Sequence, residues 1–338
     1  MICFDKLKLI SDEKNISNID TTQFKTIQID NEIIAYKYEQ NTPYSLFIQW
    51  HKQHHELVIE FTSKILLDDC IHLINIDTIR ACLTNLNQNS PCQLNIDNIL
   101  KDAIVQKCDV THDITFDNLN TLKEQIRGHL SNYNKWIDIK YSNNGMVIQN
   151  TVSTAKCKKR LIIYDKSKEL AKSKNYSFMH TLYDKQKIES YYTNKIRFEL
   201  NINTVTQIKE LLEIPDNKLS SVLSSKASPI VKVFDEAILI PEQNGYSTEL
   251  NTYDKLTFKD FTNLTDFKNY LVLKECGFDM KKLSISLKQL YSEKTQWTKT
   301  LKPYQELLQK IKPQKNILNT VRQNLNYEFF SEKPNITN

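Results

Sequence analysis

The sequence predicts an α+β protein, in which an antiparallel-rich sheet with flanking helices is followed by a smaller helical region. Over the first 240 residues, strand-like segments alternate with helical segments and turn signals. From residue 241 onward only helical patterns follow. We therefore expect a sheet domain over residues 1–240, a helical and basic domain over 241–330, and a disordered tail over 331–338.

The sheet domain is expected to begin with strands and to continue with helices between further strands. Apolar or alternating segments predict strands at residues 4–10, 27–38, 44–50, 57–61, 136–141 and 146–152. Helical patterns cover residues 78–88, 118–131 and 206–212, and a polar helical stretch covers 167–190. The turn signal Ser142-Asn143-Asn144-Gly145 predicts a hairpin.

The helical region is expected to begin after a loop at residues 241–247. Helices are predicted over residues 266–274 and 280–290, joined by the turn Glu275-Cys276-Gly277-Phe278. A long basic helix over 293–311 is expected to be interrupted near Pro303. Two helices joined by such a turn resemble a DNA-binding helix-turn-helix, in which Lys281, Lys282 and Lys288 would face phosphate. The structural alternative is an ordinary helical hairpin.

Composition narrows the class of protein. The chain has 338 residues, with 40% apolar and 25% charged residues, as in a soluble globular protein. Only 4 glycines are present, and no glycine-rich phosphate loop can be found among them. The 7 cysteines include no Cys-x-x-Cys pair, and no apolar run of transmembrane length or signal peptide is seen. We therefore expect reduced cysteines, a cytoplasmic location and no membrane partner.

Positive charge is concentrated in two places. Residues 254–338 contain 15 Lys/Arg against 9 Asp/Glu, a net of +6, which leaves −1 for the rest of a chain of net charge +5. A second cluster, residues 156–172, holds 7 cations and 2 acids. Such patches are typical of nucleic-acid binding, and a solvated charged surface is the alternative. The expected DNA contacts near the second cluster are Lys158, Lys159, Arg160 and Lys168.

Three strand segments each carry a polar face that suits the cleavage of a DNA strand. Alternation places side chains of the same face two residues apart. The residues concerned are Asp109, Thr111 and Asp113 on the first strand, Tyr164 at the end of the second, and Arg197, Glu199 and Asn201 on the third. Together they supply a tyrosine nucleophile, oxygen ligands for a divalent cation and positive charge for a phosphate.

The roles follow from the chemistry of each group. A phenol has a pKa near ~10, so Tyr164 needs nearby cations such as Lys166 to stabilise its phenolate. Asp109 and Glu199 are the expected ligands of Mg²⁺ or Mn²⁺, with Glu169 as a further ligand or orienting group. Arg197 is expected to contact a phosphate oxygen bidentately. Asp113 lies four residues from Asp109, about 13 Å along a strand, which is too far for both to hold one ion.

Other residues remain as alternatives. Tyr183 is the second candidate nucleophile, because it also stands in a Tyr-Asp-Lys sequence. Histidines 51, 54 and 55 form a His-x-x-His-His cluster that suits either a metal or a solvent-facing turn. Glu60, on the strand that follows, is an alternative ligand. Each acid-bearing strand also fits an ordinary half-solvated sheet.

These motifs resemble those of the filamentous-phage gene II type of replication initiators, a family of phage and plasmid rolling-circle replication proteins. The resemblance is carried by residues 107–111, by residues 160–170 around Tyr164, by Ile196-Arg197-Phe198-Glu199, and by the region 270–287. It implies an endonuclease and strand-joining enzyme that nicks one strand of circular DNA at an origin. In that family the motif tyrosine aligns with Tyr164, the glutamate with Glu199 and the strand aspartate with Asp109.

The resemblance also implies partners and an outcome. The tyrosine would take the 5′ phosphate and leave a 3′ hydroxyl for a host polymerase, acting with a host helicase on the origin DNA of a phage or plasmid. The His-hydrophobe-His pair of the large rolling-circle nuclease superfamily is absent from the sequence. A non-catalytic initiator, which binds the origin without cutting it, is the competing hypothesis.

Overall fold

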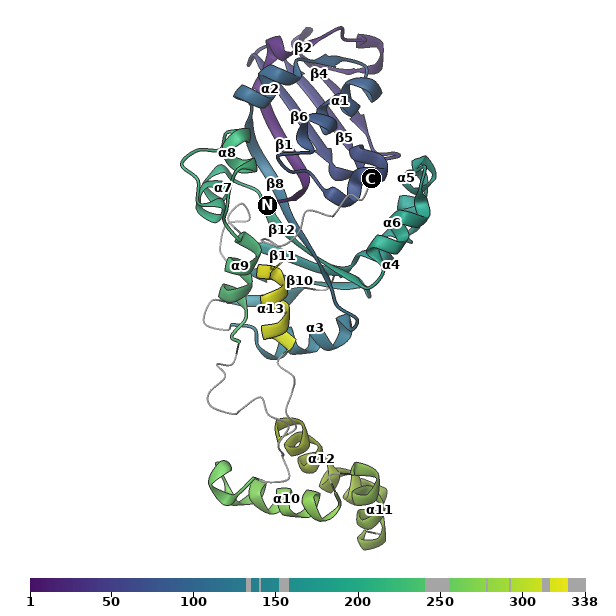
Figure 1. Cartoon of the computed structure of the whole chain (residues 1–338), viewed down its shortest axis with the longest axis vertical. Helices are drawn as coiled ribbons and strands as arrows, with labels where there is room; N and C mark the ends of the chain where they lie inside the picture. Colours follow the sequence, from purple (N-terminus) through teal and green to yellow (C-terminus); the bar gives the residue numbers. More distant parts are fainter. Residues whose placement is uncertain are drawn as a thin grey trace, which may run out of the picture. The chain divides into compact units, whose positions relative to one another are not determined.

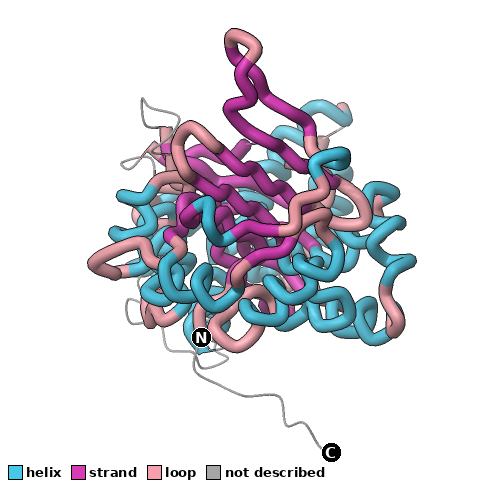
Figure 2. Tube along the Cα trace, turned by 90° about the horizontal axis from the view of Figure 1, so that it is seen from above, coloured by secondary structure: helices cyan, strands magenta, loops and turns pink. Residues whose placement is uncertain are grey.

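The computed structural model describes residues 1–131, 135–139, 141–151, 158–240, 256–277, 279–291, 293–311 and 317–327. A large antiparallel sheet of 10 strands dominates it, in the order β3-β4-β5-β6-β1-β8-β12-β11-β10-β9 (Figures 1 and 2). Its strands are β1 (Phe4–Asp12), β3 (Lys25–Ile29), β4 (Glu32–Gln40), β5 (Leu46–His51), β6 (Glu56–Thr62), β8 (Ile104–Thr115), β9 (Trp136–Ile139), β10 (Gly145–Asn150), β11 (Arg160–Asp165) and β12 (Lys195–Ile202). A separate two-stranded sheet pairs β2 (Ile16–Ser17) with β7 (Gln93–Leu94). The predicted α+β class with an antiparallel sheet is confirmed.

The helices of the larger unit lie between and after these strands. They are α1 (Ile79–Asn89), α2 (Ile96–Asp102), α3 (Leu119–Gly128), α4 (Lys166–Leu170), α5 (Tyr176–Thr181), α6 (Lys185–Tyr192), α7 (Val205–Leu212), α8 (Leu219–Leu223), α9 (Pro229–Ala237) and α13 (Ile317–Tyr327). Short 3₁₀ helices are η1 (Glu13–Asn15), η2 (Thr21–Gln23), η3 (Ser63–His72) and η5 (Ser173–Asn175). Side-chain caps fix several starts: Asn118 accepts a hydrogen bond from the backbone N–H of Thr121 at the start of α3.

Two sequence expectations differ from the structure in an instructive way. The single strand expected over residues 27–38 is a hairpin, β3 and β4, because Asp30 and Asn31 both adopt positive φ and form a tight turn. The polar helical stretch expected over 167–190 is divided into α4, η5, α5 and α6. Asp165 caps the start of α4 and Asp184 the start of α6, so local side-chain hydrogen bonds restart the helix instead of extending it.

The two faces of the large sheet have different character. One face carries apolar side chains such as Leu7, Leu9, Phe198, Leu200 and Ile163, all of them fully buried. Helices α7, α8 and α9 pack against β8, and α9 also reaches β11 and β12. The opposite face of β8, β12 and β11 carries the polar residues, and α4 packs against β11 and β12 there. The side that carries the polar residues also holds a small buried apolar cluster of Val147, Ile162 and Tyr164, because Ile162 lies directly opposite Glu199.

The chain divides into two compact units, Met1–Ile240 with Leu318–Asn338, and Pro241–Ile317. The second unit contains η7 (Phe258–Asp260), α10 (Leu264–Glu275), α11 (Met280–Leu290) and α12 (Lys294–Ile311). Its core is formed by Tyr270, Leu273, Leu283, Leu287, Leu307 and Leu308.

The expected division after residue 240 falls where the structure divides the chain, whereas α13, expected in the helical domain, is grouped with the larger unit. Arg322 on α13 pairs there with Asp235 on α9, at 2.6 Å. Helix α12 runs on through Pro303, so the expected interruption is wrong. The predicted loop over 241–247 and tail over 331–338 lie outside the described residues. Within the described ranges, no helix is long and apolar enough to cross a membrane.

Candidate functional site

The strand register brings the three predicted polar faces together. Strands β8, β12 and β11 are neighbours in the sheet. Asp109 on β8 lies opposite Asn201 on β12, and Asp113 lies opposite Arg197. Arg197 in turn lies opposite Tyr164 on β11. Because directly opposed residues share a face, the acids, the arginine and the tyrosine all project from the same side of the sheet.

A chain of hydrogen bonds joins Tyr164 to the two predicted acids. The Tyr164 hydroxyl donates to Glu199 Oε2 at 3.0 Å. Asn201 Nδ2 donates to Asp109 Oδ1 at 2.8 Å and approaches Glu199 Oε1 at 3.5 Å. The carboxylates of Asp109 and Glu199 are thus bridged by one amide, and the phenol is held against the glutamate. This arrangement across three strands is the candidate site.

Both bridged carboxyls lie in surroundings that disfavour their charge. Burial, and then the charges of Asp5 and Asp109, raises the pKa of Glu199 to about 7, although Arg197 and Lys166 oppose this. Burial also raises the pKa of Asp109 to about 6, against the hydrogen bond from Asn201. At neutral pH the site therefore holds a pair of acids whose negative charge is incompletely compensated, a condition that a bound cation relieves.

The carboxylates of Asp109 and Glu199 fit a divalent cation that takes only part of its coordination shell from the protein. Asp109 and Glu199 offer carboxylate oxygens, and Mg²⁺ is commonly held by one or two carboxylates together with water and substrate phosphate. No group of three or more metal-ligating side chains occurs among the residues that the structure describes. Glu169, which was expected as a further ligand or an orienting group, has its carboxylate engaged by lysines. Its carboxylate is paired with Lys166 at 3.2 Å and Lys174 at 3.0 Å.

Glu169 belongs to a neighbouring cluster that is fully compensated. Asn175 Nδ2 also donates to Glu169 Oε1, at 3.2 Å. Burial alone would raise the pKa of Glu169, but the two lysines and Asn175 outweigh it and hold that pKa far below its usual value. Lys166 is itself buried, and its ammonium lies 5.7 Å from the centre of the Tyr164 ring. Glu169 therefore fixes Lys166 beside the tyrosine, which is an orienting role.

Tyr164 is less activated than its sequence neighbours suggest. Only 4% of the residue is exposed, and burial together with the charge of Glu199 raises the pKa of the phenol well above its usual value. Of the nearby cations in the sequence, Lys159 pairs with Glu236 at 2.8 Å and Lys168 with Asp165 at 3.0 Å. Of this run, Lys166 lies against the Tyr164 ring, whereas Lys159 and Lys168 are paired with acids elsewhere, so fewer cations surround the phenol than the sequence suggests.

Arg197 was expected to contact a phosphate, but in the structure it is buried and binds neighbouring side chains. Its guanidinium is 1% exposed and makes two hydrogen bonds of 2.7 Å to Asp113. It also donates to Asp5 at 2.9 Å and to the Tyr192 hydroxyl at 3.1 Å. With four of its five N–H donors used in this way and 1% of the residue exposed, Arg197 is not placed to contact a phosphate, and the sequence prediction is corrected on this point. Asp113, for which no role was found in the sequence, is its main partner.

Gly145 makes room for Tyr164 and was missed by sequence reasoning except as a turn residue. It is the residue of β10 directly opposite Tyr164. A Cβ at this position would lie 2.7 Å from the Tyr164 Cβ and 2.8 Å from Cδ1 of Tyr141. The Tyr141 ring lies 6.0 Å from that of Tyr164, centre to centre. A glycine is thus required where two tyrosines converge on one backbone position.

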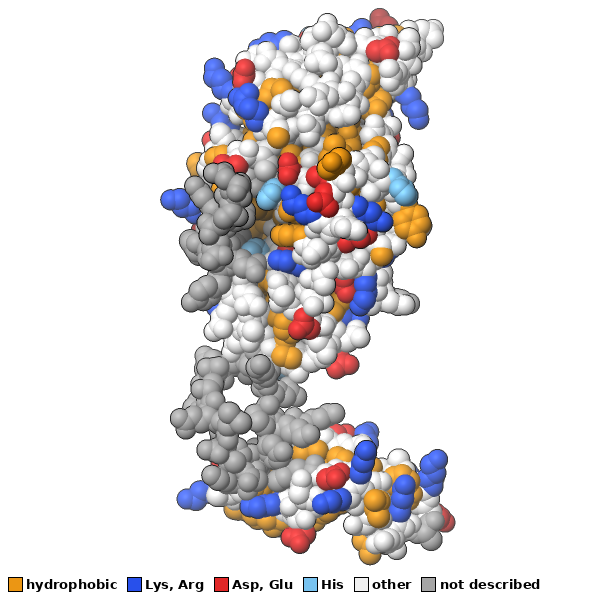
Figure 3. Space-filling view, turned by 45° about the vertical axis from the view of Figure 1, so that its right-hand side comes forward, with side chains coloured by type: hydrophobic (Ala, Val, Ile, Leu, Met, Phe, Trp, Pro, Cys, Tyr) orange, Lys and Arg blue, Asp and Glu red, His pale blue; other side chains and the backbone are white. Residues whose placement is uncertain are grey.

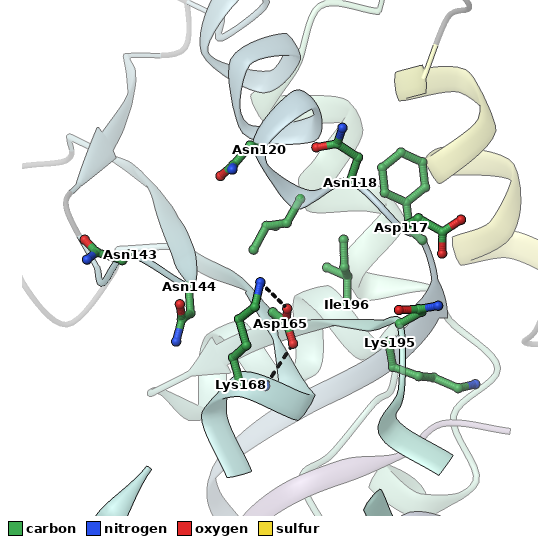
Figure 4. Close-up of a pocket in the computed structure, with 12 residues that line it drawn as sticks. Asp117, Asn118, Asn120, Asn143, Asn144, Asp165, Lys168, Lys195 and Ile196 are labelled. Atoms are coloured by element: carbon green, nitrogen blue, oxygen red, sulfur yellow. Dashed lines mark hydrogen bonds and ion pairs between the residues drawn. The ribbon is translucent and has the colours of Figure 1, made fainter. Parts of the chain in front are cut away.

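The predicted DNA-contacting cations occupy several different places. Arg160 is exposed and lies opposite Asn201, on the face of the candidate site, and Lys158 is half-buried just before it. Lys168 and Asp165 line a polar cavity of about 160 Å³ with asparagines of the α3 start and the β9–β10 turn (Figure 4). Asp165 follows Tyr164 and therefore points away from the site face.

In the second unit, Lys281 and Lys282 are exposed in the first turn of α11, and the Lys288 ammonium lies 4.8 Å from the Trp297 ring centre. Helices α10 and α11 follow one another in the chain, with Gly277 at positive φ between them. Phe278, the last residue of the expected turn, is outside the described part of the chain.

The alternative residues lie apart from the Tyr164–Glu199 pair. Tyr183 is 99% exposed, and its backbone N–H is held by Asp68 at 3.1 Å. His55 Nδ1 contacts Glu13 at 2.5 Å, in the β5–β6 turn. Glu60 forms an ion pair with Lys6. On the larger unit, acidic and basic side chains intermingle in the middle of the face seen in Figure 3.

Comparison with protein-family models, with curated proteins and with solved structures found no match. The class that the fold and the site define is an α+β protein with a buried tyrosine–carboxylate pair on an open antiparallel sheet.

Proposed function

We propose that the protein nicks and rejoins one strand of DNA through Tyr164, as a rolling-circle replication initiator of a phage or plasmid. The observation that carries the proposal is the hydrogen bond from the Tyr164 hydroxyl to Glu199, in line with Asn201 and Asp109. It joins the nucleophile to a carboxyl that can take its proton, next to a second carboxyl that suits a cation. The resemblance of the three strand motifs to gene II type initiators adds to it.

The chemical step balances with the groups of this site. The Tyr164 oxygen attacks the phosphorus and forms a phosphotyrosine bond, while the bond from phosphorus to the 3′ oxygen breaks. The phenol proton passes to Glu199 Oε2, 3.0 Å away. The departing 3′ oxygen takes a proton from solvent water to become a hydroxyl, and Glu199 releases its proton to solvent. Rejoining is the reverse, so the energy of the phosphodiester is kept and no nucleotide is consumed.

The raised pKa values support this division of labour. With a pKa of about 7, Glu199 exchanges a proton readily near neutral pH, which is what a general base needs. A divalent cation held by Asp109, the second carboxyl, would supply Lewis-acid stabilisation of the phosphate charge. Lys166, fixed by Glu169 beside the Tyr164 ring, adds positive charge at the same place.

One observation favours the competing function of a non-catalytic origin-binding initiator. Tyr164 is only 4% exposed and its pKa is raised, whereas a nucleophile must reach its phosphate. Under the catalytic hypothesis, substrate binding has to uncover the Tyr164 phenol. The partly exposed Tyr141 contacts the Tyr164 ring, so it is the side chain that would have to move. In the non-catalytic reading the tyrosine stays in place and serves the packing of the sheet.

The experiment is a search for a covalent protein–DNA complex. Purified full-length protein is incubated with supercoiled plasmid bearing the origin of its own element, with Mg²⁺ or Mn²⁺, and then denatured in SDS. Nicked circles with protein on the 5′ end are expected, and Tyr164→Phe is expected to abolish them while DNA binding remains. Tyr183→Phe is the matched control and is expected to keep the adduct.

The outcomes separate the candidate functions. An adduct that persists in Tyr164→Phe and disappears in Tyr183→Phe would move the nucleophile to the exposed loop. Origin binding with no nick and no adduct in either protein would leave the non-catalytic initiator as the function.

A further inference from the structure

A row of side chains crosses four strands of the sheet beside the candidate site. Phe47 on β5 lies opposite Glu60 on β6, Glu60 lies opposite Lys8 on β1, and Lys8 lies opposite Lys107 on β8. Lys107 precedes Asp109 by two residues on the same strand, so the row shares the face of the site. None of this row took part in the proposed chemistry.

Two of these residues are cations placed directly against each other. Lys8 and Lys107 are cross-strand partners, and like charges in such positions destabilise a sheet. Glu60 does not relieve them, because its carboxylate pairs with Lys6. Over the ranges that the structure describes, neither Lys8 nor Lys107 forms an ion pair with a carboxylate. Lys8 and Lys107 therefore place two ammonium groups side by side, and an anionic ligand bound there would offset their repulsion.

The far end of the row is aromatic. The half-buried Phe47 ring lies at the surface of an otherwise polar stretch of β5 and β4. The ammonium of Lys37 is 5.3 Å and that of Lys8 is 6.0 Å from the ring centre. Cations around an accessible ring are the combination with which proteins hold single-stranded nucleic acid, whose bases stack while the phosphates pair with lysine.

The row lies at a distance from Tyr164 that suits the same DNA strand. Asp113 stands six residues after Lys107 and is opposite Arg197, which is opposite Tyr164. Six residues along a strand correspond to about 20 Å. A few extended nucleotides span this length, and the shortest course along the sheet face between Tyr164 and the two lysines crosses Asp109.

We propose that the sheet face formed by Phe47, Lys8 and Lys107 binds single-stranded DNA that continues from the cleavage site. Lys8 and Lys107 hold successive phosphates, and drawing Lys8 toward phosphate uncovers the side of the Phe47 ring that Lys8 now faces. Lys37, the other cation at this ring, stays paired with Glu39 at 2.9 Å. The direction toward Tyr164 rests on the proposed function, whereas the binding surface itself does not. Unpaired bases are required, because stacking on Phe47 needs a base that is free of its own duplex.

The test is a binding titration of the full-length protein. A short fluorescein-labelled single strand, and the same sequence as a duplex, are titrated by fluorescence anisotropy at several salt concentrations. The double variant Lys8→Gln/Lys107→Gln is expected to bind the single strand about tenfold more weakly, with a salt slope smaller by about 1.4, which is ~0.7 for each lost phosphate contact. The matched control is the double variant Lys101→Gln/Lys226→Gln. It changes two exposed lysines, one on α2 and one in the connection between α8 and α9.

A second variant isolates the stacking. Phe47→Leu keeps an apolar side chain of similar size and is expected to lower single-strand affinity about tenfold with the salt slope unchanged. Thermal melting of each variant shows that the sheet is intact, and the lysine variant is expected to melt no lower than the unaltered protein because a like-charge pair is removed.

The result that overturns the proposal is single-strand binding equal to that of the control in both variants. A loss that is the same for duplex and single strand would also overturn it, in favour of a general electrostatic surface. Adduct formation is read in parallel. Weakened single-strand binding in the variants, without any Tyr164 adduct in the unaltered protein, would support this surface and reject the nicking function. Unchanged single-strand binding in the variants, together with a Tyr164 adduct, would reject this surface and support the nicking function.

Discussion

Arg197 and Glu199 stand two residues apart on β12, and they differ in how far neighbouring groups compensate their charges. Arg197 is surrounded by Asp113, Asp5 and the Tyr192 hydroxyl, each within 3.1 Å. Burial would lower the pKa of the guanidinium, but its acidic partners hold that pKa well above the usual value. Glu199, on the same face, has hydrogen bonds from Tyr164 and an amide and faces two further acids.

The difference between these regions teaches how to separate a structural cluster from a ligand site. The Arg197 cluster has its charge and its hydrogen bonds satisfied by protein, so it requires nothing further. The Glu199 cluster keeps a surplus of negative charge, which appears as the raised pKa values of Glu199 and Asp109. Surplus charge at a buried place has a cost in folding free energy and is typical of sites that act on something else.

The largest expected effect is the loss of the satisfied cluster. Arg197→Met leaves the carboxylates of Asp113 and Asp5 without their cation, and we expect it to lower the free energy of unfolding by about 3–5 kcal/mol. Urea denaturation at pH 7 measures it. Arg160→Gln, an exposed arginine on the neighbouring strand, is the control and should stay within about 0.5 kcal/mol. Equal losses in the two variants would contradict the assignment of the Arg197 cluster to stability.

A divalent cation is expected to have the next largest effect, at the unsatisfied cluster. At pH 8 Mg²⁺ or Mn²⁺ should raise the free energy of unfolding by about 2.7 kcal/mol when present at about 100 times its Kd. At pH 5, below the pKa values of about 6 and about 7, protonation of Asp109 and Glu199 should remove most of this gain. The variant Asp109→Asn/Glu199→Gln should not respond, and a gain of the same size in this variant would place the cation elsewhere.

The pH dependence of stability should carry the signature of Glu199. Its pKa is about 7 in the folded protein against an ordinary value of 4.5 for a glutamate, so the folded state holds the extra proton between these pH values. Stability therefore falls as pH rises through this window and levels off above it. Glu199→Gln should remove the part of the fall that Glu199 causes, which above about pH 6 is nearly all of it, because the pKa of Asp109 is about 6. It should be more stable than the unaltered protein at pH 8 by about 3 kcal/mol.

Denaturation midpoints measured from pH 4 to 9 test this expectation, with Glu189→Gln, an exposed acid on α6, as the control. If the pH profile of Glu199→Gln matches that of the unaltered protein, the proton is not on Glu199.

The smallest effect belongs to an exposed ion pair close to the site in sequence. Lys168 pairs with Asp165 at 3.0 Å, and 64% of its side chain is exposed. Lys168→Gln should change stability by less than about 0.5 kcal/mol, because solvent screens such a pair. It should also leave the pH profile as it is, since Lys168 lies on the side away from Glu199. A large loss in the same urea titration would show that the α4 cap depends on this lysine.

Much of the fold was predictable because its strands are locally encoded. Alternation at residues 196–201 identifies a strand with two unlike faces, and the hairpin around residues 142–145 has a clear turn signal. The tight turn at Asp30-Asn31 was missed, since an apolar run on both sides concealed it. Helical propensity over 167–190 was real, but the caps Asp165 and Asp184 divide it into short pieces.

The candidate site was predictable only as a set of residue types. Asp109, Tyr164 and Glu199 were selected from their strands, and the register does bring them together. The sequence did not predict which charged side chains pair with one another. Asp5 reaches Arg197 across 192 positions of the chain, and Lys174 meets Glu169 after a bend between helices. Proximity in sequence to Tyr164 was therefore a poor guide to the cations around it.

The sequence by itself determined the period of each strand, and with it which side chains share a face. Only the tertiary structure decided the state of those side chains, because pKa, burial and pairing depend on the neighbouring strands and on the helices that cover them. In the sequence, Arg197 and Glu199 are both polar residues at alternate positions of one strand, each between two apolar residues. Asp113 and Asp5 close around one of them, while Asp109 crowds the other. Electrostatic energy acts through space, so the order of residues alone does not fix it.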